Sequence, residues 1–377
     1  MKTIGIFADT VEMPTGMAIV CKNLALGLSN YPVRVVYFGR FGQQSGVGKE
    51  PVLHENSINY DLVPTEGGVW RPRTVITAIE QYDIDIIFTE DDFFSAGGLV
   101  RASKKTGKPL HFLTPIDSLP INPMAYRIFK ECKKVYVPNS SYKLIKNGVY
   151  LPHGVDREVF YPQNIQRDPD LFTFVWIGRD EPRKAMGRFI FALEKTIKKV
   201  DCQAIIHSDW RANLAMRTAR YLRYKRDLPV IMTQMEAGGQ EQLNRIYNTA
   251  DVLVCTSKAG GFEMSQTEAM ATGRPVITTD WTFMNEVVEN YKNGFKIPVA
   301  SICGDTAILY NGKRWGVPLG RKWGEISVNA LADAMRYCVD NPEVTNRMGE
   351  SAFEWVAEKY DWRKIAAKLY KEIMKNE

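Results

Sequence analysis

Residues 251–277 carry the pattern that decides the fold: DVLVCTSKAGGFEMSQTEAMATGRPVI. Residues 252–255 are apolar and predict a buried strand, and the small residues at 257–261 predict a turn that allows close backbone approach to a ligand. A helix containing Ala and Met is expected to open at 265–268 and to end near Gly273, before a second strand from Pro275. In an open parallel sheet, ligands bind at such a junction, and a helix N-terminus there favours an anion.

Short apolar runs alternate with helical patterns along the rest of the chain. Predicted strands lie at 3–8, 33–38, 84–89, 109–113 and 134–138, and then at 172–177, 204–207, 229–232, 251–255, 275–278 and 294–297. This alternation predicts doubly wound parallel sheets, and 377 residues suit two domains. We expect residues 1–152 to form one Rossmann-like domain, joined by a terminal helix at 361–377, and residues 153–360 to form the other. Residues 300–325 break the pattern and predict an inserted loop or hairpin without an assigned role.

Composition argues against several classes of protein. The net charge of +6 is too small and dispersed for a nucleic-acid partner, but it suits phosphate ligands or an anionic membrane surface. Six scattered cysteines without a C-x-x-C pair fit free thiols in a reducing, cytoplasmic compartment. Four distant histidines give no metal-ligand spacing. Asp9 and Glu12 interrupt the first apolar run, which predicts a strand rather than a signal peptide, and no run has the length of a membrane span.

The 251–277 stretch resembles the donor-site motif of the retaining GT-B glycosyltransferases of family 4. The matching residues are Glu268, Ala269, Met270, Ala271, Gly273, Pro275 and Val276. The chain departs from the motif at two places. Gly260 stands where the family has its first glutamate, and Glu263 stands where the family usually has a glycine.

Two other stretches resemble the same family. The pattern P-x-G-V-D-x-x-x-F-x-P, which the family has where the chain crosses into its second domain, is present at 152–162. Gly178 and Arg179 follow the first predicted strand of the second domain, and Lys184 comes five residues after Arg179. The family places a Gly-Arg pair and a lysine at this spacing, where both cations hold the donor diphosphate.

The resemblance implies a GT-B fold, in which two Rossmann-like α/β domains face a central cleft. It implies transfer of a sugar from a UDP- or GDP-linked donor to an acceptor hydroxyl with retention of configuration, without a metal or other cofactor. The acceptor would be a carbohydrate or a lipid-linked or protein-linked group. Residues predicted to act on the transferred group are Arg179, Lys184 and Asp117. Residues predicted to hold the donor are Gly16, Gly178, Gly261, Phe262, Glu263, Met264, Ser265 and Glu268.

Each of these assignments has a plainer alternative. The cations at 179–184 would otherwise be a solvated charged run, and Gly16 would otherwise simply start a helix. Asp117, which follows Ile116 where the family often has a histidine, would otherwise cap a turn. Glu268 is expected to accept the two ribose hydroxyls, but Ser265-x-x-Glu268 also has the spacing of a capping box.

Three charged or glycine-rich segments are read as ordinary structure. The acidic residues at 90–92 are expected to form a solvated loop and helix cap rather than a metal site. Residues 46–49 lack the remaining positions of a phosphate-binding P-loop, so we reject that reading. Residues 211–226 are rich in arginine and predict a solvated helix face, with contact to anionic lipid as the alternative.

The missing glutamate leaves two readings of Glu263. Its carboxylate reaches the transferred sugar in place of the absent Glu at position 260, or it is solvated near the helix start, where negative charge is mildly favourable. Three functions stay open at this point. They are a glycosyltransferase, a nucleotide-sugar isomerase on the same fold, and a non-catalytic sugar-nucleotide binder.

Overall fold

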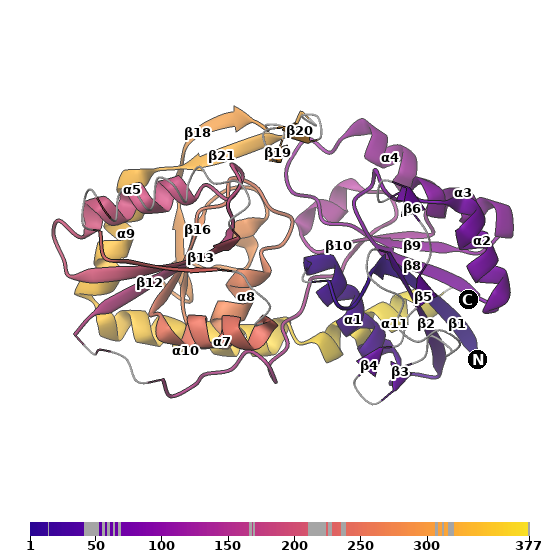
Figure 1. Ribbon diagram of the computed structural model, residues 1–377, viewed down its shortest axis with the longest axis horizontal. Coiled ribbons are helices and arrows are strands. Elements are labelled where there is room, and N and C mark those ends of the chain that lie inside the picture. The colour runs from indigo at the N-terminus through magenta and orange to yellow at the C-terminus, as the bar shows by residue number, and fades with distance from the viewer. Residues whose placement is uncertain are drawn as a thin grey trace. The chain divides into compact units, whose positions relative to one another are not determined.

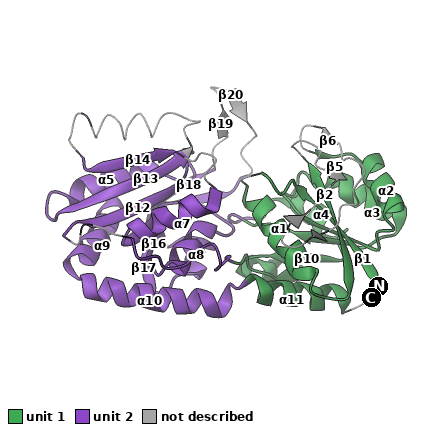
Figure 2. Cartoon of the chain, turned by 60° about the horizontal axis from the view of Figure 1, so that its bottom comes forward, with its two compact units in different colours: residues 1–116, 121–154, 362–377 green, residues 117–120, 155–361 purple. Residues whose placement is uncertain are grey.

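The computed structural model describes residues 1–13, 15–40, 69–165, 168, 170–209, 224, 228–234, 239–305 and 320–375, and the backbone of short strands within 53–66 and 308–315. The rejected P-loop segment and, except for Tyr224, the arginine-rich segment lie outside these residues. The chain forms two compact units (Figure 2). The first unit contains residues 1–116, 121–154 and 362–377, and the second contains residues 117–120 and 155–361.

The first unit is built on a seven-stranded parallel sheet with the order β11-β10-β9-β8-β1-β2-β5. Its strands are β1 (Lys2–Asp9), β2 (Val33–Arg40), β5 (Asp61–Leu62), β8 (Ile86–Glu90), β9 (Leu110–Leu113), β10 (Lys134–Val137) and β11 (Gly148–Tyr150). Two short antiparallel pairs are also present: β3 (Leu53–His54) pairs with β4 (Ser57–Ile58), and β6 (Thr65–Glu66) pairs with β7 (Val69–Trp70).

The first unit also contains helices. They are α1 (Gly16–Leu28), α2 (Pro72–Gln81), α3 (Gly97–Thr106), α4 (Pro123–Phe129), the 3₁₀ helix η1 (Ser140–Leu144) and the terminal α11 (Trp362–Met374). A Cβ atom built at Gly27 of α1 would overlap the Cβ of Ala366 in α11, so glycine permits the close approach of these two helices. The terminal helix therefore belongs to the first unit, although 361 residues precede it.

The second unit is built on a six-stranded parallel sheet with the order β14-β13-β12-β15-β16-β17. Its strands are β12 (Phe172–Arg179), β13 (Cys202–Asp209), β14 (Val230–Gln234), β15 (Val252–Cys255), β16 (Val276–Thr279) and β17 (Gly294–Ile297). Its helices are α5 (Met186–Thr196), α7 (Gly239–Thr249), α8 (Met264–Ala271), η2 (Met284–Glu286), α9 (Val328–Asp340) and α10 (Pro342–Lys359) (Figure 1).

Alternation along β12 shows how the second sheet is covered. Phe174 and Trp176 belong to one core cluster, which includes side chains of α5 and α9. Val175 belongs to the other cluster, which includes side chains of α7, α8 and α10. Successive residues of a strand point to opposite faces, so helices cover both faces of the sheet. The prediction of two doubly wound α/β domains is confirmed.

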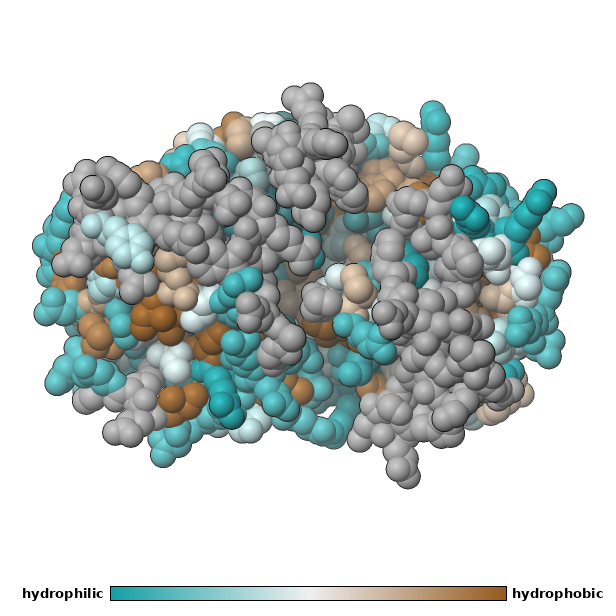
Figure 3. Space-filling model, viewed as in Figure 1, coloured by the Kyte–Doolittle hydropathy of each residue, from teal (hydrophilic) through white to brown (hydrophobic). Residues whose placement is uncertain are grey.

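The segment that interrupted the sequence pattern forms a hairpin in the second unit. β18 (Val299–Gly304) pairs antiparallel with β21 (Lys322–Ile326), and β19 (Ile308–Tyr310) pairs with β20 (Lys313–Trp315) between them. Figure 3 shows hydrophilic residues spread over the coloured part of one face, with hydrophobic residues in small groups between them. No helix in the described part of the chain is long and apolar enough to cross a membrane.

Candidate functional site

The strand order of the second sheet places three strand ends together. β12 lies beside β15, and β15 lies beside β16, while the order reverses between β12 and β15. Because all three strands are parallel, their carboxyl ends share one edge of the sheet. An open sheet binds its ligands outside the carboxyl ends at such a reversal. The loops after β12 and β15 therefore form the candidate site.

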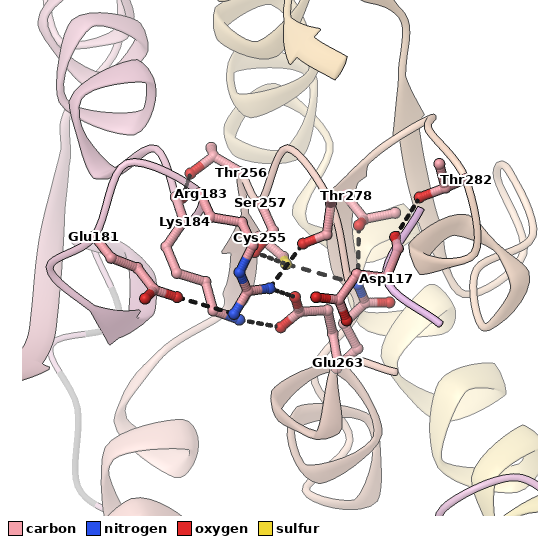
Figure 4. A network of polar contacts seen from close by, with 12 residues as sticks. Asp117, Glu181, Arg183, Lys184, Cys255, Thr256, Ser257, Glu263, Thr278 and Thr282 are labelled. Atoms are coloured by element: carbon pink, nitrogen blue, oxygen red, sulfur yellow. Dashed lines mark hydrogen bonds and ion pairs between the residues drawn. The ribbon is translucent and has the colours of Figure 1, made fainter. Parts of the chain in front are cut away.

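Cations after β12 meet a carboxylate at the start of α8 (Figure 4). The Lys184 Nζ lies 2.5 Å from the Glu263 Oε2. The Arg183 guanidinium donates to the Ala259 carbonyl at 2.8 Å and to the Glu181 Oε1 at 2.9 Å, and it lies 3.6 Å from the Glu263 Oε1. Burial disfavours the charge of Arg183, but the nearby carboxylates outweigh burial and raise its pKa.

The Thr256 side chain connects the loop after β12 to the loop after β15. The Thr256 hydroxyl donates to the Lys184 carbonyl at 2.9 Å and accepts from the Trp176 indole N–H at 3.0 Å. The backbone N–H of Lys258 donates to the Arg183 carbonyl at 2.7 Å. These bonds fix the cation loop against the turn that follows β15. The sequence did not lead to Arg183 or Thr256 as residues of the site.

The glycine at position 260 and the glutamate at position 263 are packed against each other. A Cβ atom built at Gly260 would overlap the Glu263 Oε1 and would lie 3.1 Å from its Cδ. The Glu263 side chain is only 6% exposed, because it turns back over Gly260 toward the cations. Glu263 is not solvated, so that reading of it is wrong. The carboxylate fills the space that a side chain at 260 would need.

The ribose candidate Glu268 is not part of a capping box. Helix α8 begins at Met264 with Glu263 as its N-cap residue, so Ser265 lies inside the helix. The Glu268 Oε2 instead accepts a hydrogen bond from the Tyr247 hydroxyl at 2.8 Å. Burial raises the pKa of Glu268 to about 7, although the bond from Tyr247 acts to lower it. Tyr247, on α7, was not found from sequence.

The remaining donor candidates lie on the same side of the second sheet. Gly178 and Arg179 end β12, and the Arg179 side chain is exposed. Gly261 is buried, and Phe262 packs edge-on against Tyr360 with ring centroids 5.7 Å apart. Met264 and Ser265 form the first turn of α8 and are partly exposed. The arrangement brings the predicted 178–184 and 261–268 segments to one edge.

Asp117 clusters with the second unit, although it lies in the range expected for the first domain. Its backbone carbonyl accepts from the Gly260 N–H at 3.2 Å, and its Oδ2 accepts from the Arg321 NH1 at 3.1 Å. The carboxylate thus pairs with an arginine of the inserted hairpin. Gly16 is the first residue of α1 in the first unit, where Thr15 caps the helix by accepting from the Ala18 N–H. Its predicted contact with the donor stays a prediction.

The prediction of a solvated loop at 90–92 is wrong for Glu90 and Asp91. Glu90 and Asp91 are each only 1% exposed, so they do not form a solvated loop. The Asp91 carboxylate accepts from the Arg40 guanidinium at 2.6 and 2.9 Å and from the Trp70 indole at 3.1 Å. The Arg40 Nε also donates to the Asp9 Oδ1 at 2.8 Å. Arg40, at the end of β2, supplies the positive charge that compensates the buried Asp91 carboxylate.

The described residues contain no cluster of three His, Cys, Asp or Glu side chains that could hold a metal ion. Cations, helix N-terminus and carboxylates are therefore the chemical groups that the candidate site offers. Together they suit a ligand with an anionic part and a hydroxyl-bearing part, because cations and backbone N–H groups bind the former and carboxylates accept hydrogen bonds from the latter.

Comparison with known proteins follows this geometry. Residues 172–307 match the family model described as Glycosyl transferases group 1. A phosphatidyl-myo-inositol mannosyltransferase of Mycobacterium tuberculosis is 26% identical over 239 residues, which cover 59% of this chain and 53% of that protein. The chain thus spans about half the length of this curated relative. An uncharacterized glycosyltransferase of Methanocaldococcus jannaschii is 21% identical over 324 residues, covering 74% of this chain and 80% of that protein.

Solved structures share the fold over the full length. Sucrose-phosphate synthase from Thermosynechococcus elongatus has a TM-score of 0.75 at 17% identity, with 100% of both chains covered. HepE of Anabaena, in complex with UDP and glucose, has a TM-score of 0.72 at 15% identity, again with 100% of both chains covered. The chain therefore has the GT-B fold, and residues 172–307 of its second unit match the glycosyl transferases group 1 model.

Proposed function

We propose that this chain transfers a sugar from a UDP- or GDP-linked donor to an acceptor hydroxyl with retention of configuration. The observation that carries the proposal is the joining of Lys184, Glu263 and Glu268 at one sheet edge inside the 172–307 match. Cations and a helix N-terminus suit the diphosphate of a nucleotide, and a carboxylate suits the hydroxyls of its ribose. HepE, which shares the fold, was crystallised with UDP and glucose.

The chemistry assigns the cations to the leaving group. Breaking the sugar–phosphate bond develops negative charge on the diphosphate, and preorganised cations stabilise that charge as it forms. We assign this role to Lys184 and Arg179, with the first turn of α8 supplying backbone N–H groups. Glu268 holds the ribose, and Asp117 and Glu263 hold the transferred sugar. The reaction as proposed needs no metal ion or cofactor, because these groups supply the positive charge.

The acceptor is the second half of the proposal. The mycobacterial relative is named as a mannosyltransferase of phosphatidyl-myo-inositol, which favours a lipid-linked or carbohydrate acceptor here over a protein-linked one. We assign acceptor binding to the first unit, and bringing an acceptor hydroxyl to the anomeric carbon is work of proximity and orientation. The proposed location is the cytoplasm, with membrane contact where the acceptor is a lipid.

One incubation separates this function from its alternatives. Purified protein is mixed with UDP- and GDP-linked glucose, N-acetylglucosamine and mannose, with and without sugar glycosides or phosphatidylinositol vesicles. A transferase releases nucleotide only with an acceptor or, more slowly, with water, and the anomeric coupling constants of the product give the stereochemistry. An isomerase changes the donor sugar without an acceptor. Donor binding with neither change would show a non-catalytic binder and overturn the proposal.

A further inference from the structure

The hairpin of β18 and β21 is closed by a buried aspartate next to an arginine. The Asp305 carboxylate accepts from the backbone N–H groups of Gly320 and Arg321 at 3.1 and 3.2 Å. It also accepts from the Arg321 Nε at 3.2 Å, and its own side chain is only 3% exposed. Arg321 is therefore fixed immediately before the returning strand β21.

The returning strand is attached to elements of the candidate site. The Lys322 N–H donates to the Leu119 carbonyl at 3.0 Å, and the Gly324 N–H donates to the Lys258 carbonyl at 2.9 Å. The Lys258 Nζ donates to the Glu325 Oε1 at 2.5 Å. The hairpin is thus bound on one side to the 117–120 segment and on the other to the turn after β15. Residues 322–325 of the returning strand therefore lie beside the candidate site.

Arg321 and Asp117 meet where these attachments converge. The Arg321 NH1 donates to the Asp117 Oδ2 at 3.1 Å, and their side chains are 25% and 27% exposed. Asp117 is connected in turn to the turn after β15, because its carbonyl accepts from the Gly260 N–H. The pair keeps hydrogen-bonding capacity for a ligand, since the bonds to Asp305 and Asp117 use two of the five guanidinium N–H groups.

The hydrogen-bonding groups of this pair decide which part of a donor it suits. The diphosphate is already assigned to Lys184, Arg179 and the backbone N–H groups in the first turn of α8. A carboxylate that accepts and a guanidinium that donates match two neighbouring hydroxyl groups of a sugar.

We propose that Arg321 and Asp117 together recognise a neighbouring pair of hydroxyls on the transferred sugar, and that the hairpin at 299–326 thereby sets the sugar preference. This inference rests on the proposed function. Arg321 has two parts in it. It contacts a sugar oxygen itself, and it holds the Asp117 carboxylate in the orientation that accepts from the adjacent hydroxyl.

Calorimetry on four variants tests the pair without depending on turnover. The quantity measured is the ratio of the nucleotide Kd to the nucleotide-sugar Kd, for UDP and GDP against their glucose, N-acetylglucosamine and mannose conjugates. The variants are Arg321→Ala, Arg321→Lys, Asp117→Asn and the double variant Arg321→Ala with Asp117→Asn. Arg336→Ala is the matched control, because it removes an arginine that pairs with Asp333 on the surface of α9 in the same unit.

Arg321→Ala and Asp117→Asn should each lower the ratio for the preferred sugar by about tenfold or more, as expected for losing a charge-assisted hydrogen bond. Their affinities for bare UDP and GDP should stay within about twofold of wild type. The double variant should lose no more than about twice the larger single loss, because the two side chains act as one unit. Arg321→Lys should recover part of the ratio, and Arg336→Ala should change nothing.

Three outcomes overturn the inference. The first is an unchanged ratio in Arg321→Ala, and the second is an equal loss of nucleotide and nucleotide-sugar affinity, which would show a merely structural role. A wild-type protein that binds nucleotide sugars no more tightly than nucleotides would also overturn it. Failure of the proposed function looks different, since the ratio would respond to Arg321 while no sugar is transferred.

Discussion

The carboxyl edges of the two sheets carry cations that differ in their exposure to solvent. In the first unit, Arg40 is 6% exposed, and its partners Asp9 and Asp91 are 8% and 2% exposed. In the second unit, the cations Lys184, Arg183 and Arg321 are 17%, 25% and 25% exposed, although their partners Glu263 and Asp305 are 6% and 3% exposed. Each of these pairs lies within hydrogen-bonding or ion-pair distance. The difference is whether solvent, and so a ligand, can reach them.

This difference distinguishes charged residues that stabilise the fold from charged residues that can bind a ligand. A buried ion pair carries a large desolvation penalty, and removing one partner leaves an uncompensated charge in the core. A partly exposed pair contributes little to stability, so its members are free to exchange partners when a ligand arrives. The first edge is therefore expected to respond to mutation as a core does, and the second as a binding site does.

The largest expected effect is on stability in the first unit. Arg40→Ala should lower the free energy of unfolding by about 3–5 kcal/mol, because it leaves two buried carboxylates without their cation. Urea unfolding measures it, with Lys104→Ala as control, since the Lys104 side chain is 59% exposed. Arg321→Ala, in the second unit, should lose less, because two backbone N–H groups still donate to the buried Asp305 carboxylate when the guanidinium is removed. Equal losses for Arg40→Ala and Arg321→Ala would remove the contrast between the two edges.

The next effect is on nucleotide binding by the second unit. Lys184→Ala should weaken UDP or GDP binding by about 2–5 kcal/mol, since it removes a partly buried cation from the diphosphate. Arg179→Ala should weaken it less, because the Arg179 side chain is exposed. Calorimetry measures both. Lys198→Ala is the control, on a side chain that is 68% exposed. Unchanged affinities in both site variants would refute the diphosphate assignment.

A smaller effect concerns the packing of Glu263 over Gly260. Gly260→Ala should displace the Glu263 carboxylate, and Glu263→Ala should remove it, so both should lower kcat on the preferred donor by about tenfold, or about 1.4 kcal/mol. Bare nucleotide affinity should hardly change. Gly187→Ala is the matched control, because nothing lies within 4 Å of a Cβ built there. Wild-type turnover in Glu263→Ala would show that the sugar is held elsewhere.

The smallest effect is a shift in pH dependence. The hydroxyl of Tyr247 lowers the pKa of Glu268, which burial has raised to about 7. Tyr247→Phe removes that bond while keeping the ring, so the pKa should rise and fewer carboxylates should be charged at pH 7. Nucleotide affinity should fall at pH 7 and return near pH 8, which calorimetry across pH 6–9 would show. An unmoved profile would mean that Glu268 does not bind the ribose as a carboxylate.

Stability should respond to pH in the opposite sense. The ordinary pKa of a glutamate is 4.5, and that of Glu268 in the folded protein is about 7. A raised pKa favours the folded state fully below pH 4.5 and loses that contribution as pH rises through about 7. Glu268→Gln should therefore lose this dependence, and melting temperatures from pH 4 to pH 8 measure it.

The sequence predicted the features that depend on local residue pattern. Apolar runs located both sheets, and the spacing after Gly178 led to Lys184. It did not predict partners that lie far apart along the chain. Arg40 and Asp91 are 51 residues apart, and Arg321 and Asp117 are 204 apart. Their meeting depends on strand order and on a hairpin whose pattern carried no functional signal.

The capping-box alternative shows the same limit from the other side. Ser265 and Glu268 have the right spacing for a box, but the helix begins one residue earlier and Tyr247 engages Glu268. Local spacing allowed a capping box, the helix start excludes it, and the ribose role of Glu268 stays a prediction. Burial of Asp91 was missed for a similar reason, since the compensating Arg40 lies on another strand.

The overlap between position 260 and the Glu263 carboxylate also constrains history. A side chain at 260 would require the Glu263 carboxylate to leave its present position, whereas glycine at 260 leaves that position open. Glycine at 260 is therefore expected to accompany glutamate at 263. In reconstructed ancestors, glycine at 260 should appear no later than glutamate at 263, and reverting 260 alone should be more harmful than reverting both positions.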